Sequence, residues 1–234
     1  MKVTLFVPTL NEEDGIRVIM PKIKKEWCDQ ILIADGQSTD RTVEEAQKLG
    51  YEVYVQKKKG IRNAYIEAWP LIRGDVVITF SPDGNCIVED IPALIAKMKE
   101  GFDMVIASRY YQNAKSEDDT IITRLGNFVF TSLINMFHCG HYTDALTIYR
   151  AYRTKLFYEL DLHMEATYAP ERFFLTTIGV EPVLSIRAAK KKMKIAEIPS
   201  DEPARMIGEK KLQIFRWGAS YLAQIFRETY YWKT

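Results

Sequence analysis

The loop formed by residues 81–85 is the part of the chain best placed to do chemistry. It follows the apolar run 76–80, which predicts a buried strand, and its Ser-Pro-Asp-Gly sequence is typical of a turn. Asp83 and Asn85 therefore stand just past the carboxyl end of a strand, where open α/β sheets bind their ligands. Their carboxylate and amide oxygens suit a hard divalent cation that holds a diphosphate. An ordinary strand-end turn is the alternative interpretation.

Two further polar turns follow predicted strands. Asn11 and Glu12 follow the first strand of the chain, and Asp35 and Asp40 follow the second. Because parallel strands end at one edge of a sheet, we expect all three turns to meet at one cleft. There Asp35 could accept hydrogen bonds from a nucleobase or ribose, and Asp83 could hold a metal ion. For Asp40 the sequence favours capping of the next helix over contact with a ligand.

The first half of the chain alternates strands with helices. This alternation indicates βαβ units, an α/β fold and a mostly parallel sheet. The second strand is apolar throughout, as expected for a strand that is buried on both faces. The expected strands are residues 3–7, 30–34, 52–55, 75–80 and 104–107, and the expected helices are 14–26, 42–49, 61–71 and 91–100.

The second half of the chain is less regular. One helix is expected over residues 120–137, and a last helix, rich in aromatic residues, over residues 212–232. The remaining expected elements are short helices at 157–160 and 171–178, a strand at 193–198, and strands or irregular segments at 142–149 and 183–186.

Composition is ordinary for a globular protein. The 234 residues are 47% hydrophobic and 27% charged, and the net charge of +1 gives no indication of nucleic-acid binding. Three separated cysteines fit a reducing compartment, and no stretch approaches the roughly 20 apolar residues that span a bilayer. The first apolar run is also too short for a signal peptide. We therefore expect a cytoplasmic protein, or one at the cytoplasmic face of a membrane.

The strand-end motifs together resemble those of family 2 glycosyltransferases with the GT-A fold. They are Val-Pro-Thr-Leu-Asn-Glu at 7–12, Ala-Asp-Gly-Gln-Ser-Thr-Asp-Arg-Thr at 34–42 and Ser-Pro-Asp-Gly-Asn at 81–85. Segments 107–110, 143–153 and 196–199 further resemble the dolichol-phosphate mannose synthase, or polyprenyl-phosphate glycosyltransferase, branch. In that branch a sugar passes from a nucleotide donor to a polyprenyl phosphate, with inversion at the anomeric carbon.

The resemblance implies one GT-A domain over residues 1–234. Residues 1–110 would bind the nucleotide-sugar, 111–211 would form the acceptor side, and 212–234 a C-terminal amphipathic helix. Asp83 and Asn85 would hold Mg²⁺ or Mn²⁺. The catalytic residues would be Asp83, Arg109 and Asp144. The nucleotide-sugar would contact Pro8, Leu10, Glu12, Asp35, Gly60, Arg62 and Asp83, and the phosphates or acceptor would contact Arg109, Arg124, Arg205, Lys210 and Lys211.

Two residues depart from the family pattern. Ser81 stands where the family's metal motif has its first acid, and a neutral hydroxyl is a weaker ligand than a carboxylate. Either the affinity for the metal falls or the diphosphate supplies more of the coordination. Gly36 replaces a common second Asp after the second strand, which could change the preference for base or ribose.

The chemistry of the acceptor decides whether a general base is needed. Displacement of a nucleoside diphosphate requires a cation and arginines to stabilise the leaving group. A phosphate acceptor is already an anion and needs little help from a base. A hydroxyl acceptor needs a carboxylate, for which Asp144 and Glu171 are the candidates.

The sequence also allows other functions and partners. A glycosyltransferase with a saccharide or other hydroxyl acceptor is one alternative, and a nucleotide-sugar binding protein without turnover is another. A nucleotidyltransferase would carry a Gly-rich loop after the first strand, and residues 8–11 are not one. The basic and aromatic last helix fits a membrane surface, but also packing on the core or a contact in a homo-oligomer. The pair His138 and His141 lacks metal-ligand spacing.

Overall fold

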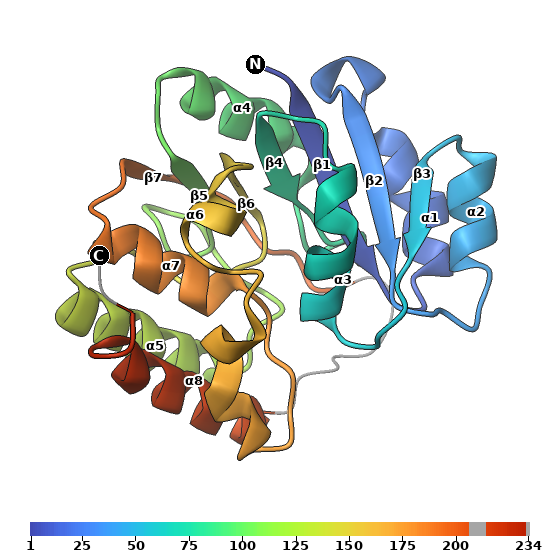
Figure 1. Cartoon of the computed structure of the whole chain (residues 1–234). Helices are drawn as coiled ribbons and strands as arrows, with labels where there is room; N and C mark the ends of the chain where they lie inside the picture. Colours follow the sequence, from blue (N-terminus) through green and yellow to red (C-terminus); the bar gives the residue numbers. More distant parts are fainter. Residues whose placement is uncertain (206–213, 233–234) are drawn as a thin grey trace.

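A computed structural model describes residues 1–205 and 214–232 of the chain (Figure 1). Within these residues one seven-stranded sheet has the order β3-β2-β1-β4-β6-β5-β7. The strands are β1 (Val3–Thr9), β2 (Gln30–Asp35), β3 (Glu52–Val55), β4 (Val76–Thr79), β5 (Met104–Ser108), β6 (Arg150–Arg153) and β7 (Ile195–Pro199). The helices are α1 (Glu13–Val18), α2 (Thr42–Lys48), α3 (Ile61–Ala68), α4 (Ile91–Lys99), α5 (Ile121–His138), α6 (Leu156–Glu159), α7 (Glu181–Lys190) and α8 (Ile214–Glu228).

Helices cover both faces of the sheet, so its central strands are buried on both sides (Figure 1). Alternate residues of β1 show this directly. Phe6 packs into the core under α3 and α7, while Leu5 and Val7 pack into the core under α1, α2 and α4. The fully apolar strands of the sequence are therefore interior strands, as predicted.

β6 is the strand that the sequence did not reveal. Segment 142–149, expected as a strand or an irregular segment, lies just before β6 and is irregular. Arg150–Arg153 pair antiparallel with both β4 and β5. The sheet is still mostly parallel, because β1, β2, β3 and β4 pair in parallel and so do β5 and β7. The strand was missed because it reads Arg-Ala-Tyr-Arg, and Arg150 in it is fully buried.

Segment 183–186, expected as a strand or an irregular segment, lies inside helix α7. Pro182 stands in the first turn of this helix, and nine of its ten residues are buried. A helix that is buried all round has no polar face, so its apolar run resembles that of a buried strand.

Helices α5, α7 and α8 pack together below the sheet (Figure 1). Arg187 of α7 and Glu228 of α8 form a fully buried ion pair with two hydrogen bonds, of 3.0 and 2.9 Å. This pair fixes the inner face of α8 to the core. The expected helix over 212–232 thus corresponds to α8, although residues 212 and 213 lie outside the described part of the chain. No helix among the described residues is long and apolar enough to cross a membrane.

Candidate active site

The ends of β1 and β2 are joined by hydrogen bonds between their turns. Asn11 accepts from the backbone N–H of Thr39 at 2.8 Å and donates its own N–H to Ser38 Oγ, also at 2.8 Å. Asn11 adopts a left-handed backbone with φ of 55°, which Asn tolerates better than most residues. The first two polar turns of the sequence therefore meet at one edge, as expected.

The third turn is brought to the same edge by β4. β1 pairs with β4 in parallel, and the N–H of Phe80 continues the ladder to the carbonyl of Phe6 at 3.0 Å. Gly15, at the start of α1, allows the loop to pack closely, because a Cβ at this position would collide with the carbonyl of Pro82. The loop is thus held against α1, with Asp83 buried at 3% exposure.

The predicted base and ribose contacts lie at the ends of β1 and β2. Asp35 is fully buried and accepts hydrogen bonds from the N–H and Oγ of Ser38, at 2.9 and 2.5 Å. Pro8 is half-buried, Leu10 is 41% exposed, and the N–H of Glu12 donates to Thr42 Oγ1 at 2.8 Å. Their contacts with a nucleotide stay predictions.

Asp40 precedes Arg41, the N-cap residue of α2, and contacts the first residue of this helix. Its carboxylate accepts a hydrogen bond of 3.0 Å from the N–H of Thr42, the first residue of α2. It also accepts one of 2.5 Å from Thr42 Oγ1. Asp40 thus anchors the start of the helix, at the N-terminal end where a negative charge is stabilised.

Gly60 and Arg62 lie at the start of α3, and Gln56 links this segment to the β2 turn: it donates to the carbonyl of Gly60 and its own carbonyl accepts from Gln37, both at 3.2 Å. Gly60 has φ of 110°, which disfavours any other residue. Arg62 forms a buried bidentate ion pair with Glu171. The guanidinium carbon of Arg62 also lies 4.3 Å from the ring centre of Tyr168. Glu171 also accepts a hydrogen bond from the N–H of Ile178 at 3.1 Å. The pair connects the two halves of the chain, and a role of Arg62 toward a nucleotide stays a prediction.

Beyond the β4 loop lies a cluster of alternating charges, which we call the arginine cluster: Asp83, Arg109, Asp144, Glu202 and Arg205. Arg109 makes its closest contacts with Asp144, at 2.6 and 3.0 Å. Its Nη1 lies 3.4 Å from both carboxylate oxygens of Glu202. Arg205 contacts Asp83 at 3.0 Å. The structure therefore pairs two of the predicted residues, Arg109 and Asp144, with each other, and it pairs Arg205 with Asp83.

The remaining predicted phosphate contacts lie at the margin of this cluster or beyond the described residues. Arg124 is exposed in the first turn of α5, with its guanidinium 5.9 Å from the ring centre of Tyr110. The same ring lies 5.3 Å from the guanidinium of Arg109. Tyr110 thus lies between the two arginines. Lys210 and Lys211 fall outside the described part of the chain.

The pKa of Asp144 depends on its ion-pair partner, Arg109. Burial opposes ionisation of this fully buried carboxyl, but the charge and hydrogen bonds of Arg109 outweigh burial and lower its pKa. The fully buried Arg150 of β6 adds to this effect and holds the loop in place, donating to the carbonyls of Ala145 and Thr147. Asp144 is therefore an ionised partner of Arg109.

Sequence reasoning missed two acidic residues of this region. Glu197 of β7 accepts hydrogen bonds from the N–H groups of Thr143 and Asp144, at 2.9 and 3.2 Å. Glu202 lies in the loop after β7 and also accepts from Ser116 Oγ. Burial raises the pKa of both carboxyls. The motif Ala-Glu-Ile-Pro contains Glu197 and could have indicated it, but no motif contains Glu202.

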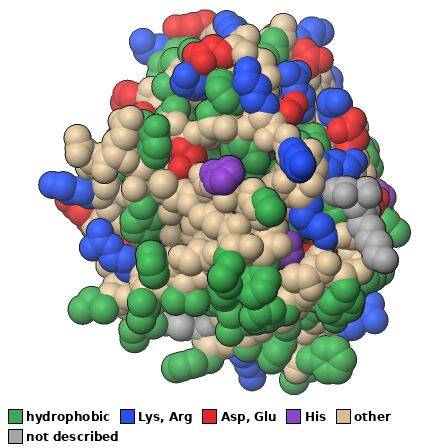
Figure 2. Space-filling view, turned by 90° about the vertical axis from the view of Figure 1, so that its left-hand side faces the viewer, with side chains coloured by type: hydrophobic (Ala, Val, Ile, Leu, Met, Phe, Trp, Pro, Cys, Tyr) green, Lys and Arg blue, Asp and Glu red, His purple; other side chains and the backbone are tan. Residues whose placement is uncertain are grey.

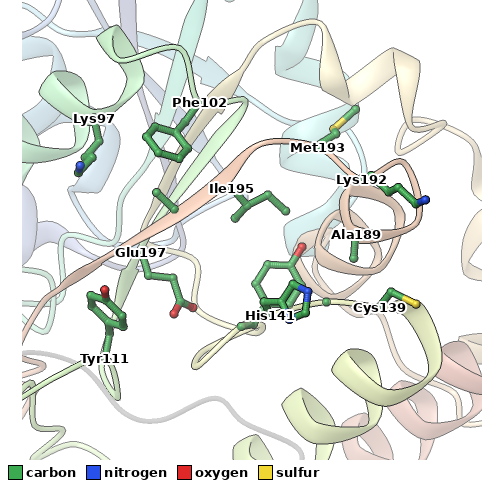
Figure 3. A pocket seen from close by; sticks show the side chains of 13 residues that line it. Lys97, Phe102, Tyr111, Cys139, His141, Ala189, Lys192, Met193, Ile195 and Glu197 are labelled. Carbon is green, nitrogen blue, oxygen red and sulfur yellow. The ribbon is translucent and has the colours of Figure 1, made fainter.

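A cavity of about 670 Å³ lies beside the arginine cluster, along β7 (Figure 3). Figure 3 shows Ile195 and Glu197 of β7 on one side of it, with His141 and Tyr111 nearby. None of the predicted site residues lines this cavity. Glu197 connects the cavity to the arginine cluster, because it lines the cavity and its carboxylate accepts a hydrogen bond from the N–H of Asp144.

The residues around Asp83 fit a divalent cation in part. No group of three or more His, Cys, Asp and Glu side chains that could hold a metal occurs in residues 1–205 and 214–232. Asp83 nevertheless already holds a positive charge, the guanidinium of Arg205. Asn85 stands beside it, with its N–H 3.4 Å from Asp83 Oδ1. A cation here would take oxygen ligands from both and further ligands from a diphosphate.

A mixed sheet that brings polar loops to the carboxyl ends of β1, β2 and β4 has the edge at which open α/β proteins bind their ligands. The profile of glycosyl transferase family 2 matches residues 4–161 of the chain. The chain therefore belongs to glycosyltransferase family 2, whose activity is nucleotide-sugar-dependent glycosyl transfer. This confirms the resemblance seen in the strand-end motifs.

Curated relatives extend the match over nearly the whole chain. The dolichol-phosphate mannosyltransferase of Pyrococcus furiosus is 28% identical over 97% of this chain and 63% of its own length. The glycosyltransferase AglJ of Haloferax volcanii is 26% identical over 96% of this chain and 71% of its own. A dolichyl-phosphate hexose transferase of the same organism is 28% identical over 91% of this chain and 87% of its own length. The chain thus spans less than two thirds of the Pyrococcus protein.

A solved structure with the same fold is glucosyl-3-phosphoglycerate synthase from Mycobacterium tuberculosis, in complex with Mn²⁺, UDP-glucose and phosphoglyceric acid. It superposes with a TM-score of 0.71 at 19% identity, over 97% of this chain and 79% of that one. The GT-A fold predicted from the motifs is therefore confirmed.

The Arg109–Asp144 pair should stabilise the fold in a pH-dependent way. Asp144→Asn should lower the free energy of unfolding at pH 7 by about 3 kcal/mol, because a buried arginine loses its closest partner. The pKa of Asp144 is lowered on folding, so its contribution is present at neutral pH and is lost as the pH falls below about 4. Urea unfolding of both proteins from pH 7 to pH 3 measures the difference.

Asp103→Asn is the matched control. Asp103 pairs with Arg153 at 3.0 Å, but both side chains are about one third exposed, so we expect a loss of less than about 1 kcal/mol. A destabilisation by Asp144→Asn that equals this control, or that does not shrink on acidification, would contradict the assignment.

Proposed function

We propose that the protein transfers a sugar from a nucleotide-sugar to a polyprenyl phosphate, with inversion and with the help of Mg²⁺ or Mn²⁺. The observation that carries the proposal is the arginine cluster at the carboxyl edge of the sheet. In it Arg205 contacts Asp83, the carboxylate proposed to hold the cation, and Arg109 contacts Asp144 and Glu202. Glycosyl transfer from a diphosphate needs this combination of charges.

In this proposal Asp83 and Asn85 would hold the cation, which would supply positive charge for the diphosphate leaving group. Arg205 leaves Asp83 for a phosphate when the donor binds, because a diphosphate offers the guanidinium a stronger bidentate partner. Arg109 is held in place by Asp144 and presents its remaining N–H groups toward the phosphates. Lys210 and Lys211 follow Arg205 in the sequence, and their contact with the phosphates stays a prediction.

The acceptor that best suits this site is one that is already an anion. Two carboxylates were candidates for a general base, and each lies in a buried ion pair: Asp144 with Arg109 and Glu171 with Arg62. The carboxylate oxygens of both residues are occupied by a guanidinium group, so each is a poor base for a hydroxyl acceptor. A phosphate acceptor needs no such base and is attracted by Arg109 and Arg124.

An exposed apolar surface on α5 and α8 supports a lipid acceptor. Figure 2 shows hydrophobic side chains gathered along the lower edge of the face on which these helices lie. Contiguous apolar surface of this kind marks a docking site for protein or membrane. Its exposed members are Ile121, Ile122, Leu125, Phe128, Met136 and Phe137 of α5, and Phe215, Leu222 and Phe226 of α8.

The position of this surface also suits a lipid phosphate. Arg124 lies in the same first turn of α5 as Ile121 and Ile122, next to Tyr110 and so near Arg109. A lipid whose chain lies along the apolar face of α5 can therefore place its phosphate between the two arginines. The names of two relatives, a dolichol-phosphate mannosyltransferase and a dolichyl-phosphate hexose transferase, agree with such an acceptor.

The alternative acceptor is a small soluble molecule. The glucosyl-3-phosphoglycerate synthase structure contains phosphoglyceric acid, which is a phosphorylated compound with a hydroxyl. A soluble acceptor would leave the apolar surface of α5 and α8 to another partner, such as a second copy of the chain. The experiments below separate these possibilities.

The donor and cation are tested by thermal stability with UDP-, GDP-, CDP- and dTDP-sugars, each with and without Mn²⁺. A ligand that binds only the folded state raises the melting temperature. We expect one nucleotide to shift it by several degrees only with Mn²⁺, and Asp83→Asn to abolish that shift. Glu89→Gln, an exposed acid after the same loop, should leave it unchanged. A metal-independent shift would count against Asp83 and Asn85 as ligands.

Membrane binding is tested by co-sedimentation with vesicles of phosphatidylcholine and phosphatidylglycerol. Phe128→Glu should lower vesicle binding at least about tenfold, since burial of one Phe stabilises association by about 1.5–3 kcal/mol. Val18→Glu is the control, because Val18 is also exposed but lies in α1, on the opposite side of the molecule (Figure 1). Equal binding by both variants would contradict the lipid-facing surface.

A further inference from the structure

The proposed cation site has a shortage of negative charge. Ser81 stands where the family's metal motif has an acid, so the β4 loop supplies only one carboxylate, that of Asp83. A hydroxyl and an amide are neutral donors, whereas divalent cations in proteins are usually bound by carboxylates. The loop alone is therefore a weak site.

We propose that Glu202, from the loop after β7, supplies the second carboxylate of this cation site and so replaces the acid missing at position 81. This inference rests on the proposed function, because it concerns the same cation. Glu202 lies 117 positions along the chain from Asn85 of the β4 loop, so only the fold brings the two together.

The backbone of Glu202 is fixed in place. Its N–H donates to the carbonyl of Lys115 at 2.8 Å, and its own carbonyl accepts from the N–H of Glu117, also at 2.8 Å. This ladder joins the loop after β7 to the segment that follows β5. A carboxylate on such a support keeps its position when its side-chain partners change.

The side chain of Glu202 points to the β4 loop. Its Oε1 lies 3.5 Å from Asn85 Nδ2, and the N–H of Asn85 lies 3.4 Å from Asp83 Oδ1. Asn85 is therefore flanked by the two carboxylates. The Glu202 side chain is only 12% exposed, so its charge faces the site and not bulk water.

Each of the two carboxylates now contacts a guanidinium group that a cation could replace, and Glu202 in addition keeps the hydrogen bond that it accepts from Ser116 Oγ. Glu202 holds Arg109 at 3.4 Å, a much looser contact than the 2.6 Å between Arg109 and Asp144. Asp83 holds Arg205 at 3.0 Å. One divalent cation between Asp83 and Glu202 would replace both guanidinium contacts. It would also release Arg109 and Arg205 from these acids for the diphosphate, while Asp144 keeps Arg109 oriented.

Removing the carboxylate at position 202 and adding one at position 81 tests the proposal. Binding of Mn²⁺ alone is measured by electron paramagnetic resonance, which does not depend on turnover. Glu202→Gln should weaken Mn²⁺ binding at least tenfold. Adding Ser81→Asp to that variant returns a carboxylate to the motif, and it should restore the affinity to within about threefold of the original, a difference below 1 kcal/mol. Circular dichroism verifies that each variant is folded.

Glu117→Gln is the matched control, because Glu117 is exposed and lies in the same ladder. It should bind Mn²⁺ like the unchanged protein. Unchanged binding by Glu202→Gln would overturn the proposal. So would failure of Ser81→Asp to restore binding, which would mean that Glu202 only positions Arg109 and Asn85.

The same titrations separate this proposal from the proposed function. If Asp83→Asn abolishes Mn²⁺ binding and Glu202→Gln does not, the cation site stands and only the role of Glu202 is wrong. If Asp83→Asn also leaves Mn²⁺ binding unchanged, the cation site itself is wrong, and the proposed function fails with it.

Discussion

The site depends on a balance of buried charges at the carboxyl edge of the sheet. Asp83, Asp144 and Glu202 are largely removed from water, and each lies against a guanidinium of Arg109 or Arg205. A buried carboxylate without such a partner would cost several kcal/mol. The arginines therefore balance the charge of these acids, and a ligand that brings both a cation and phosphates can replace the arginine–carboxylate contacts with new contacts of the same charge.

A few closely packed or buried positions in the fold place these charges. Gly15 allows α1 to approach Pro82, which sets the Asp83 loop at the edge. β6 runs antiparallel between β4 and β5, and its buried Arg150 secures the loop that carries Asp144. The central sheet is common to many functions, so the chemistry comes from these loops and not from the strands.

The sequence predicted the parts of the molecule that depend on local patterns. Apolar runs identified β1, β2 and β4, and turn residues after them located Asn11, Asp35 and Asp83. It could not reveal β6, because Arg150 interrupts the apolar pattern, or α7, because a helix buried all round has no polar face. Glu202 was also beyond reach, since its position beside Asn85 depends on pairing between segments that are distant along the chain.

The most direct test of the account is a transfer assay with matched acceptors. The donor would be the nucleotide-sugar that stabilises the protein with Mn²⁺, and the acceptors a polyprenyl phosphate and the polyprenol of the same chain length. The account predicts transfer to the phosphate alone, because the site offers arginines and its candidate bases, Asp144 and Glu171, are engaged in ion pairs. Transfer to the polyprenol, or to a soluble saccharide in place of the lipid phosphate, would contradict it.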